Sequence, residues 1–179
     1  MLKKREQYNK EQAAKKAAAN REETVEIVSL QEHVELADSF FKKREYAKAA
    51  FGYEQAFMLT GSTDLEIGRK LCKAYMNVGR KKEVLAVLSD LIQKHEGKGF
   101  TGDDFAMYAA SIYAYFTDGE ENYLDDIIQD CFHYSARQLL LNSISYARKL
   151  GTDLPEFKEM EKYAKKEKGG LGGLFKRGK

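Results

Sequence analysis

The sequence is poor in proline and cysteine and lacks tryptophan. It has one proline and two cysteines among its 179 residues, so almost the whole chain is free of proline, which interrupts helices. Strand-like runs that alternate Val, Ile and Thr are also missing, while Ala, Leu, Lys and Glu recur at helical spacing. These features predict an all-α protein.

Long apolar runs are absent as well. No segment approaches the roughly 20 continuous apolar residues that a membrane span requires, and the basic start at residues 3–5 is followed by no apolar stretch that could serve as a secretion signal. We therefore expect a cytoplasmic protein, with a peripheral place in a membrane-associated complex as the alternative.

The sequence also lacks a dominant charge. Its net charge is +2, but residues 1–24 carry 7 basic and 4 acidic side chains, residues 25–157 carry 15 and 21, and residues 158–179 carry 8 and 3. Because the central part is acidic, it does not predict a nucleic-acid-binding surface.

Groups that could perform catalysis or bind a metal are few. Cys72 and Cys131 lie among apolar neighbours in helical patterns, which predicts buried, reduced thiols. His33, His95 and His133 are far apart in the sequence, and none has a companion at metal-ligand spacing. We therefore expect a non-catalytic protein with no cofactor and no metal.

A helix-start signal occurs three times. The segments Ser29-Leu30-Gln31-Glu32, Thr63-Asp64-Leu65-Glu66 and Thr101-Gly102-Asp103-Asp104 each resemble a capping box. Their starts lie 34 and 38 residues apart, a period typical of stacked helical repeats.

Polar breaks divide each repeat into two helices. Gly79 suits the left-handed backbone that ends a helix, and similar breaks occur near Arg44 and Gly119. The predicted helices span residues 30–43, 45–60, 64–78, 81–95, 103–117, 120–133, 136–150 and 155–168.

The first predicted hairpin resembles the tetratricopeptide repeat (TPR) family in its alternation of large and small residues. Small residues let two helices approach closely, and aromatic rings fill the space between hairpins. The positions that carry the resemblance are Leu36, Ala37, Phe40, Tyr46, Ala49, Tyr53 and Ala56.

Later repeats follow the pattern less closely. The second contains Leu71, Tyr75, Gly79, Leu88 and Leu91, while the third keeps Ala110 and Tyr113. The resemblance implies a TPR-like α-solenoid of about three repeats plus a C-terminal capping helix pair. We predict a charged Ala/Lys/Glu-rich arm, either helical or disordered, over residues 1–28, the TPR-like domain over 29–168 and a flexible Gly-rich basic tail over 169–179.

In the TPR family the first helix of each hairpin lines a concave groove that binds a partner. When the family's groove positions are transferred to this sequence one by one, the resemblance implies groove residues on three of the predicted helices. The predicted partner-binding residues are Asp38, Phe41, Lys42, Arg69, Lys73, Met76, Asn77, Met107, Ser111 and Tyr115.

These residues suggest the chemistry of a partner. Aromatic and methionine side chains provide apolar contacts, while Lys42, Arg69 and Lys73 form a local positive patch. A protein or peptide with acidic and apolar residues would fit. The family's carboxylate clamp requires Lys and Asn where this sequence has Val34 and Asp38, so a receptor for chaperone tails is not expected.

The resemblance favours a scaffold or adaptor function. The alternatives are a secretion- or assembly-type chaperone for a client protein, and recruitment to a membrane surface through the tail. The tail combines three bulky apolar residues with basic ones, which predicts a docking segment or a weak membrane contact. Its candidate docking residues are Leu171, Leu174, Phe175, Lys176 and Arg177.

Overall fold

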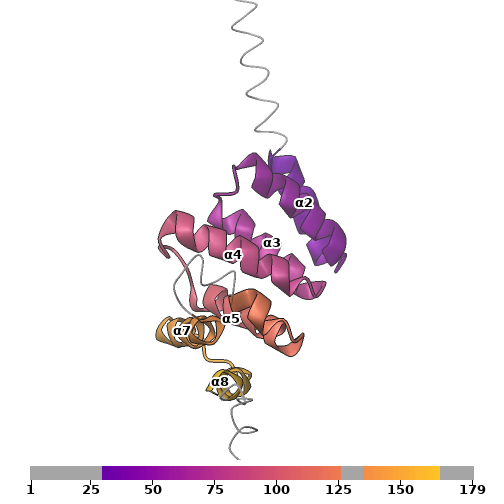
Figure 1. Ribbon diagram of the computed structural model, residues 1–179. Helices are drawn as coiled ribbons and strands as arrows, with labels where there is room; N and C mark the ends of the chain where they lie inside the picture. Colours follow the sequence, from indigo (N-terminus) through magenta and orange to yellow (C-terminus); the bar gives the residue numbers. More distant parts are fainter. Residues whose placement is uncertain (1–29, 126–134, 166–179) are drawn as a thin grey trace, which may run out of the picture. The chain divides into compact units, whose positions relative to one another are not determined.

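The computed structural model describes residues 30–125 and 135–165 (Figure 1). Every regular element in this part of the chain is a helix, so the all-α prediction is confirmed. The helices comprise residues 30–42, α2 (Tyr46–Leu59), α3 (Leu65–Asn77), α4 (Lys81–His95), α5 (Gly102–Thr117), residues 121–125, α7 (Ala136–Lys149) and α8 (Phe157–Lys165).

The chain divides into two compact units, one ending at Ala74 and one beginning at Tyr75. The division falls within α3. The first unit consists of helical residues 30–42, α2 and most of α3, and the second runs from the end of α3 through α8.

Helix starts are determined by local capping, partly as predicted. At the start of α5, Thr101 and Asp104 form the predicted capping box, in which the Asp104 carboxylate accepts from the Thr101 amide at 2.8 Å. At the start of α3 the prediction is wrong by one residue. Asp64, and not Thr63, accepts from the amide of Ile67 at 2.8 Å. The Thr63 hydroxyl donates to the Thr60 carbonyl instead. The predicted cap at Ser29 lies outside the described residues.

The turns at the three predicted breaks share one geometry, which also ends α2, α4 and α7. A residue with positive φ is followed by an amide that donates to the carbonyl five residues earlier, as in a Schellman-type helix end. At the three breaks the pairs are Glu45 to Phe40, Arg80 to Tyr75 and Glu120 to Tyr115, at 2.8–2.9 Å. The positive-φ residues are Arg44, Gly79 and Gly119, so each of the three predicted breaks is a turn that ends a helix.

The core of the first unit contains most of the predicted packing positions. Ala37, Ala49, Tyr53 and Ala56 are buried. A side chain at Gly52 would place its Cβ 2.9 Å from the Cβ of Ala37, so the two helices of this hairpin approach most closely where both residues are small. Leu36 differs from the expectation because it is largely exposed.

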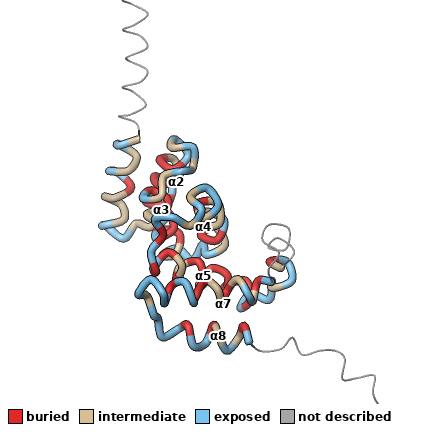
Figure 2. Tube along the Cα trace, turned by 90° about the vertical axis from the view of Figure 1, so that its left-hand side faces the viewer, coloured by how far each residue is buried: buried red, intermediate tan, exposed pale blue. Residues whose placement is uncertain are grey.

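In the second unit the helices pack in succession, α4 on α5, α5 on α7 and α7 on α8. Figure 2 shows their buried residues in red. Gly102 allows the start of α5 to approach the end of α7, because a Cβ there would lie 2.4 Å from the Thr152 hydroxyl. The helix α8 is held by Phe157, which is fully buried, and by the ring of Tyr163, which stacks on Phe116 at 5.4 Å.

Candidate functional site

A bonded carboxylate joins the three helices of the first unit. Asp38 accepts a hydrogen bond from the Tyr53 hydroxyl of α2 at 2.6 Å. It also accepts two from the ammonium of Lys70 on α3, at 2.9 and 3.0 Å. The Asp38 and Lys70 side chains are each about one-third exposed, at 35% and 30%. The carboxylate therefore determines how this surface is arranged.

These hydrogen bonds shift the pKa of the Asp38 carboxyl and that of the Tyr53 phenol in opposite directions. Partial burial of Asp38 acts to raise the pKa of its carboxyl, but hydrogen bonds from Tyr53 and Lys70 and the charges of Lys70 and Lys42 outweigh it, so the pKa lies below its ordinary value. Burial, together with the neighbouring Asp38 carboxylate, raises the pKa of Tyr53. At neutral pH the pair is a carboxylate and a neutral phenol.

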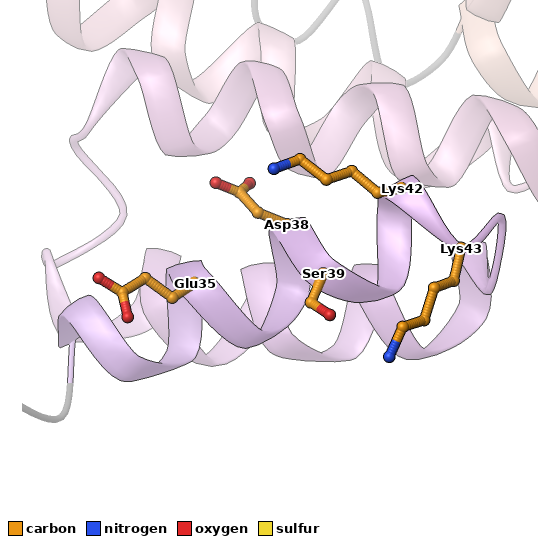
Figure 3. Close-up of a pocket in the computed structure, with 5 residues that line it drawn as sticks. All are labelled: Glu35, Asp38, Ser39, Lys42 and Lys43. Atoms are coloured by element: carbon orange, nitrogen blue, oxygen red, sulfur yellow. The ribbon is translucent and has the colours of Figure 1, made fainter.

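An open pocket lies along the helix that carries Asp38 (Figure 3). In the close-up the Lys42 amine extends over the same side of the helix as the Asp38 carboxylate, while Ser39 and Lys43 point to another side. The pocket offers ammonium and hydroxyl donors beside carboxylates, which suits the polar groups of a peptide. Its lining residues are Glu35, Asp38, Ser39, Lys42 and Lys43.

The first unit holds five of the predicted partner-binding residues. Lys42 and Lys73 are exposed, and Arg69 is half-buried with its guanidinium 4.0 Å from Glu66. Phe41 is also half-buried, with its ring 5.1 Å from that of Tyr46. Asp38 is the fifth, and its bonds to Tyr53 and Lys70 give it a structural role on this surface.

The other five predicted residues belong to the second unit. Asn77 is exposed, and Met76 and Met107 are half-buried. Ser111 is fully buried and its hydroxyl donates to the Met107 carbonyl at 2.8 Å. Tyr115 is also buried, and the ammonium of Lys82 lies 5.1 Å from the centre of its ring. The expectation of accessible contacts at Ser111 and Tyr115 is therefore corrected, because both positions face the packed side of α5.

Several residues at the site were not among the sequence predictions. Glu35, Ser39 and Lys43 repeat at four-residue spacing, which places them on one helical face, so their grouping could have been found from periodicity. Lys70 could not have been found this way. It is 32 residues from Asp38, and no local pattern relates the two.

The predicted tail residues Leu171, Leu174, Phe175, Lys176 and Arg177 lie outside the described residues, as do Cys131 and His133. Cys72 is buried as expected. Within residues 30–125 and 135–165, no group of three or more His, Cys, Asp or Glu side chains is placed to hold a metal ion. In the same part of the chain no helix is both long and apolar enough to cross a membrane.

No protein-family model, curated protein or solved structure matches the chain. The TPR resemblance therefore rests on this chain's own residues.

Proposed function

We propose that this chain is a non-catalytic protein–protein interaction module of TPR-like architecture. It binds a partner peptide or helix along the face made by helical residues 30–42 and α3. The observation that carries the proposal is the open pocket beside Asp38, which has exposed basic side chains around a carboxylate that is already neutralised by Lys70.

Charge supports a partner with acidic residues. Lys42 and Lys43 line the pocket and are exposed, and Lys73 on α3 is exposed as well. Lys42 follows Asp38, and Lys73 follows Lys70, by about one helical turn, so both lie one turn beyond the contact between the two helices. Because Asp38 is bonded within the protein, the exposed ammonium groups of Lys42 and Lys43 can bind a partner's carboxylates.

Half-buried aromatic groups support an apolar component in the same partner. Phe41 packs between Tyr46 and Tyr53, with ring centroids 5.1 and 6.5 Å away. A ring held in this way can offer its remaining surface without losing much conformational freedom on binding. The partner we propose therefore carries acidic residues next to apolar ones.

The proposal is tested with two variants of equal charge change. Lys42→Glu/Lys73→Glu reverses two exposed charges at the site, and Lys158→Glu/Lys162→Glu reverses two exposed charges on α8. Proteins captured by each from cell extract are identified by mass and compared with those captured by the unmodified chain. We expect the site variant to lose the partner, and the α8 variant to retain it.

Circular dichroism and melting temperature should be unchanged in both variants, because exposed lysines contribute little to stability. Retention of the partner by the site variant, or its loss from both variants, would contradict the proposed surface. A single abundant client would indicate the chaperone alternative, while a multi-subunit set would indicate a scaffold. Membrane recruitment through the tail stays a separate prediction.

A further inference from the structure

The hairpin of helical residues 30–42 and α2 has one side that faces away from α3. Asp38 is bonded to Lys70 on α3, so its side of the helix faces that element. Successive helical residues are about 100° apart around the axis. Leu36 and Phe40 are each two residues from Asp38, and they therefore lie on the opposite side of the same helix.

That side of the hairpin is apolar and exposed. Leu36 is 55% exposed, and Phe51 of α2 is 64% exposed. The ammonium of Lys48 lies 5.4 Å from the centre of the half-buried Phe40 ring. Because Phe51 follows Lys48 by three residues, α2 presents Phe51 to the same side. Isolated exposed apolar residues are ordinary, but several together on one side mark a surface that another molecule or segment covers.

Two charged residues extend the apolar pair into a row. Glu32, Leu36, Phe40 and Arg44 follow one another at four-residue spacing, which places them along one ridge of the helix and of the turn that ends it. Glu32 and Arg44 are both exposed. The row therefore runs from an acidic residue, through two apolar residues, to a basic one.

We propose that a second copy of this chain covers the row, in a two-fold symmetric dimer in which helical residues 30–42 of the two molecules pack antiparallel. Ridges at four-residue spacing pack alongside each other in the commonest class of helix contact. With the two-fold axis level with Asp38, Leu36 of one copy lies opposite Phe40 of the other, and Glu32 lies opposite Arg44. Each pairing occurs twice, because a two-fold interface uses the same surface of both copies.

The charges favour this occupant and this direction. In the antiparallel dimer each exposed Glu32 meets an exposed Arg44 of the other copy, whereas a parallel pairing would place Glu32 beside Glu32 and Arg44 beside Arg44. The row thus supplies to its own copy both a matching apolar pair and the reversed order of charges. Because Asp38 lies on the other side of the helix, the dimer forms without a ligand in the pocket, and the proposal is independent of the proposed function.

Charge reversals in the full chain test the pairing. Glu32→Arg places two basic groups together at both symmetric contacts, and Arg44→Glu places two acidic groups together, so each variant alone should dimerise at least about tenfold more weakly than the unmodified chain. An equal mixture of the two variants restores an opposite-charge pair at both contacts, and a mixed dimer should form. Sedimentation over a concentration series measures the association. Native mass spectrometry identifies the mixed dimer, because the two variants differ in mass.

Three further variants separate this contact from the rest of the surface. Leu36→Glu places a charge at the apolar centre of the dimer contact and should leave single chains. Leu150→Glu, the same change at an exposed leucine of the second unit, should retain the dimer. The pocket variant Lys42→Glu/Lys73→Glu should also retain it, so failure of the dimer and failure of the proposed function are distinguishable. Circular dichroism checks that all variants keep their helices.

Three outcomes would overturn the proposal. Single chains at every concentration of the unmodified protein would show that no second copy binds, and slow thiol labelling of Leu36→Cys, with Cys72 and Cys131 mapped separately, would then show that another segment of the same chain shields the row. A dimer that Leu36→Glu forms as tightly as the unmodified chain would show that the copies meet at another surface. A mixture of the two charge variants that associates no better than either alone would contradict the antiparallel pairing.

Discussion

At the scale of single residues, Asp38 connects all three helices of the first unit and lies in the pocket of the proposed binding surface. Its predicted role was a direct contact with a partner. The structure gives its carboxylate a role in orienting Lys70 and Tyr53. Lys42, whose side chain lies on the same side of the helix, is then the exposed basic group beside it.

The protonation of Asp38 should contribute to stability in a pH-dependent way. Its pKa in the folded protein lies below the ordinary value of 3.8, so its contribution is present above about pH 4 and is lost as pH falls through the folded pKa. Asp38→Asn should lower the free energy of unfolding at pH 7 by about 1 kcal/mol or less, because the ion pair is partly exposed. Urea unfolding at pH 7 and pH 3 should show this difference shrinking at the lower pH. A constant difference would contradict the assignment.

The close contact between Ala37 and Gly52 predicts that Gly52→Ala has opposite effects on stability in two backgrounds. Gly52→Ala gains about 1 kcal/mol of helix propensity but crowds Ala37, at a cost of about 1–3 kcal/mol. We expect a net loss of about 1 kcal/mol, measured by urea unfolding. In the Ala37→Gly background the crowding methyl is absent, so Gly52→Ala should stabilise the protein by about 1 kcal/mol. The same sign in both backgrounds would show that the contact is not tight.

At the scale of elements, the turns that follow helical residues 30–42, α3 and α5 have the same hydrogen bond but not the same residue. Gly79 and Gly119 occupy the left-handed position in two of them, and Arg44 occupies it in the first, with φ of 62°. A side chain in this conformation costs about 1–2 kcal/mol, which glycine avoids. The first turn is therefore a strained version of a motif that the other two form readily.

Substitutions at equivalent turns should have opposite effects. Arg44→Gly should stabilise the protein by roughly 0.5–1 kcal/mol, and Gly79→Ala should destabilise it by roughly 1 kcal/mol. No atom lies within 4 Å of a Cβ built at Gly79, so the second effect reports backbone strain alone. Thermal melts of the two variants test the pair. Destabilisation by Arg44→Gly would show that the arginine side chain makes a contribution larger than the strain.

At the scale of the whole molecule, each of the two units buries apolar residues of its own. The first is built on Ala37, Tyr53 and Leu71, and the second on residues such as Ile112 and Phe157, all of them buried. In helical repeats the interactions are between neighbours, so local stability can differ along the chain. The shared helix α3 is the covalent link between the units.

Removing a buried side chain from the second unit should therefore lower local stability there more than in the first unit. Phe157→Ala removes a fully buried ring and should cost about 3–5 kcal/mol in the second unit. Native-state hydrogen exchange should show a strong loss of protection in α7 and α8 and a much smaller loss in α2. An equal loss throughout would indicate one cooperative unit.

Most of the helix map could be predicted from the sequence, because its signals are local. Capping residues, turn glycines and apolar spacing act within a few positions. The predicted boundaries of α4 match the observed ones, and those of α5 differ by one residue at its start. The cap of α3 was misplaced by one position because Thr63 and Asp64 are both good caps, and only the backbone geometry decides between them.

The candidate site depended on tertiary structure. The sequence by itself determined that the chain forms helices and, to within one or two residues, where most of the described helices begin and end. Only the tertiary structure decided that Asp38 is neutralised by Lys70, that Ser111 and Tyr115 are buried and that Leu36 is exposed. The physical reason is distance along the chain. Each of these outcomes depends on which distant helix packs beside the residue, and a local sequence pattern does not predict that helix.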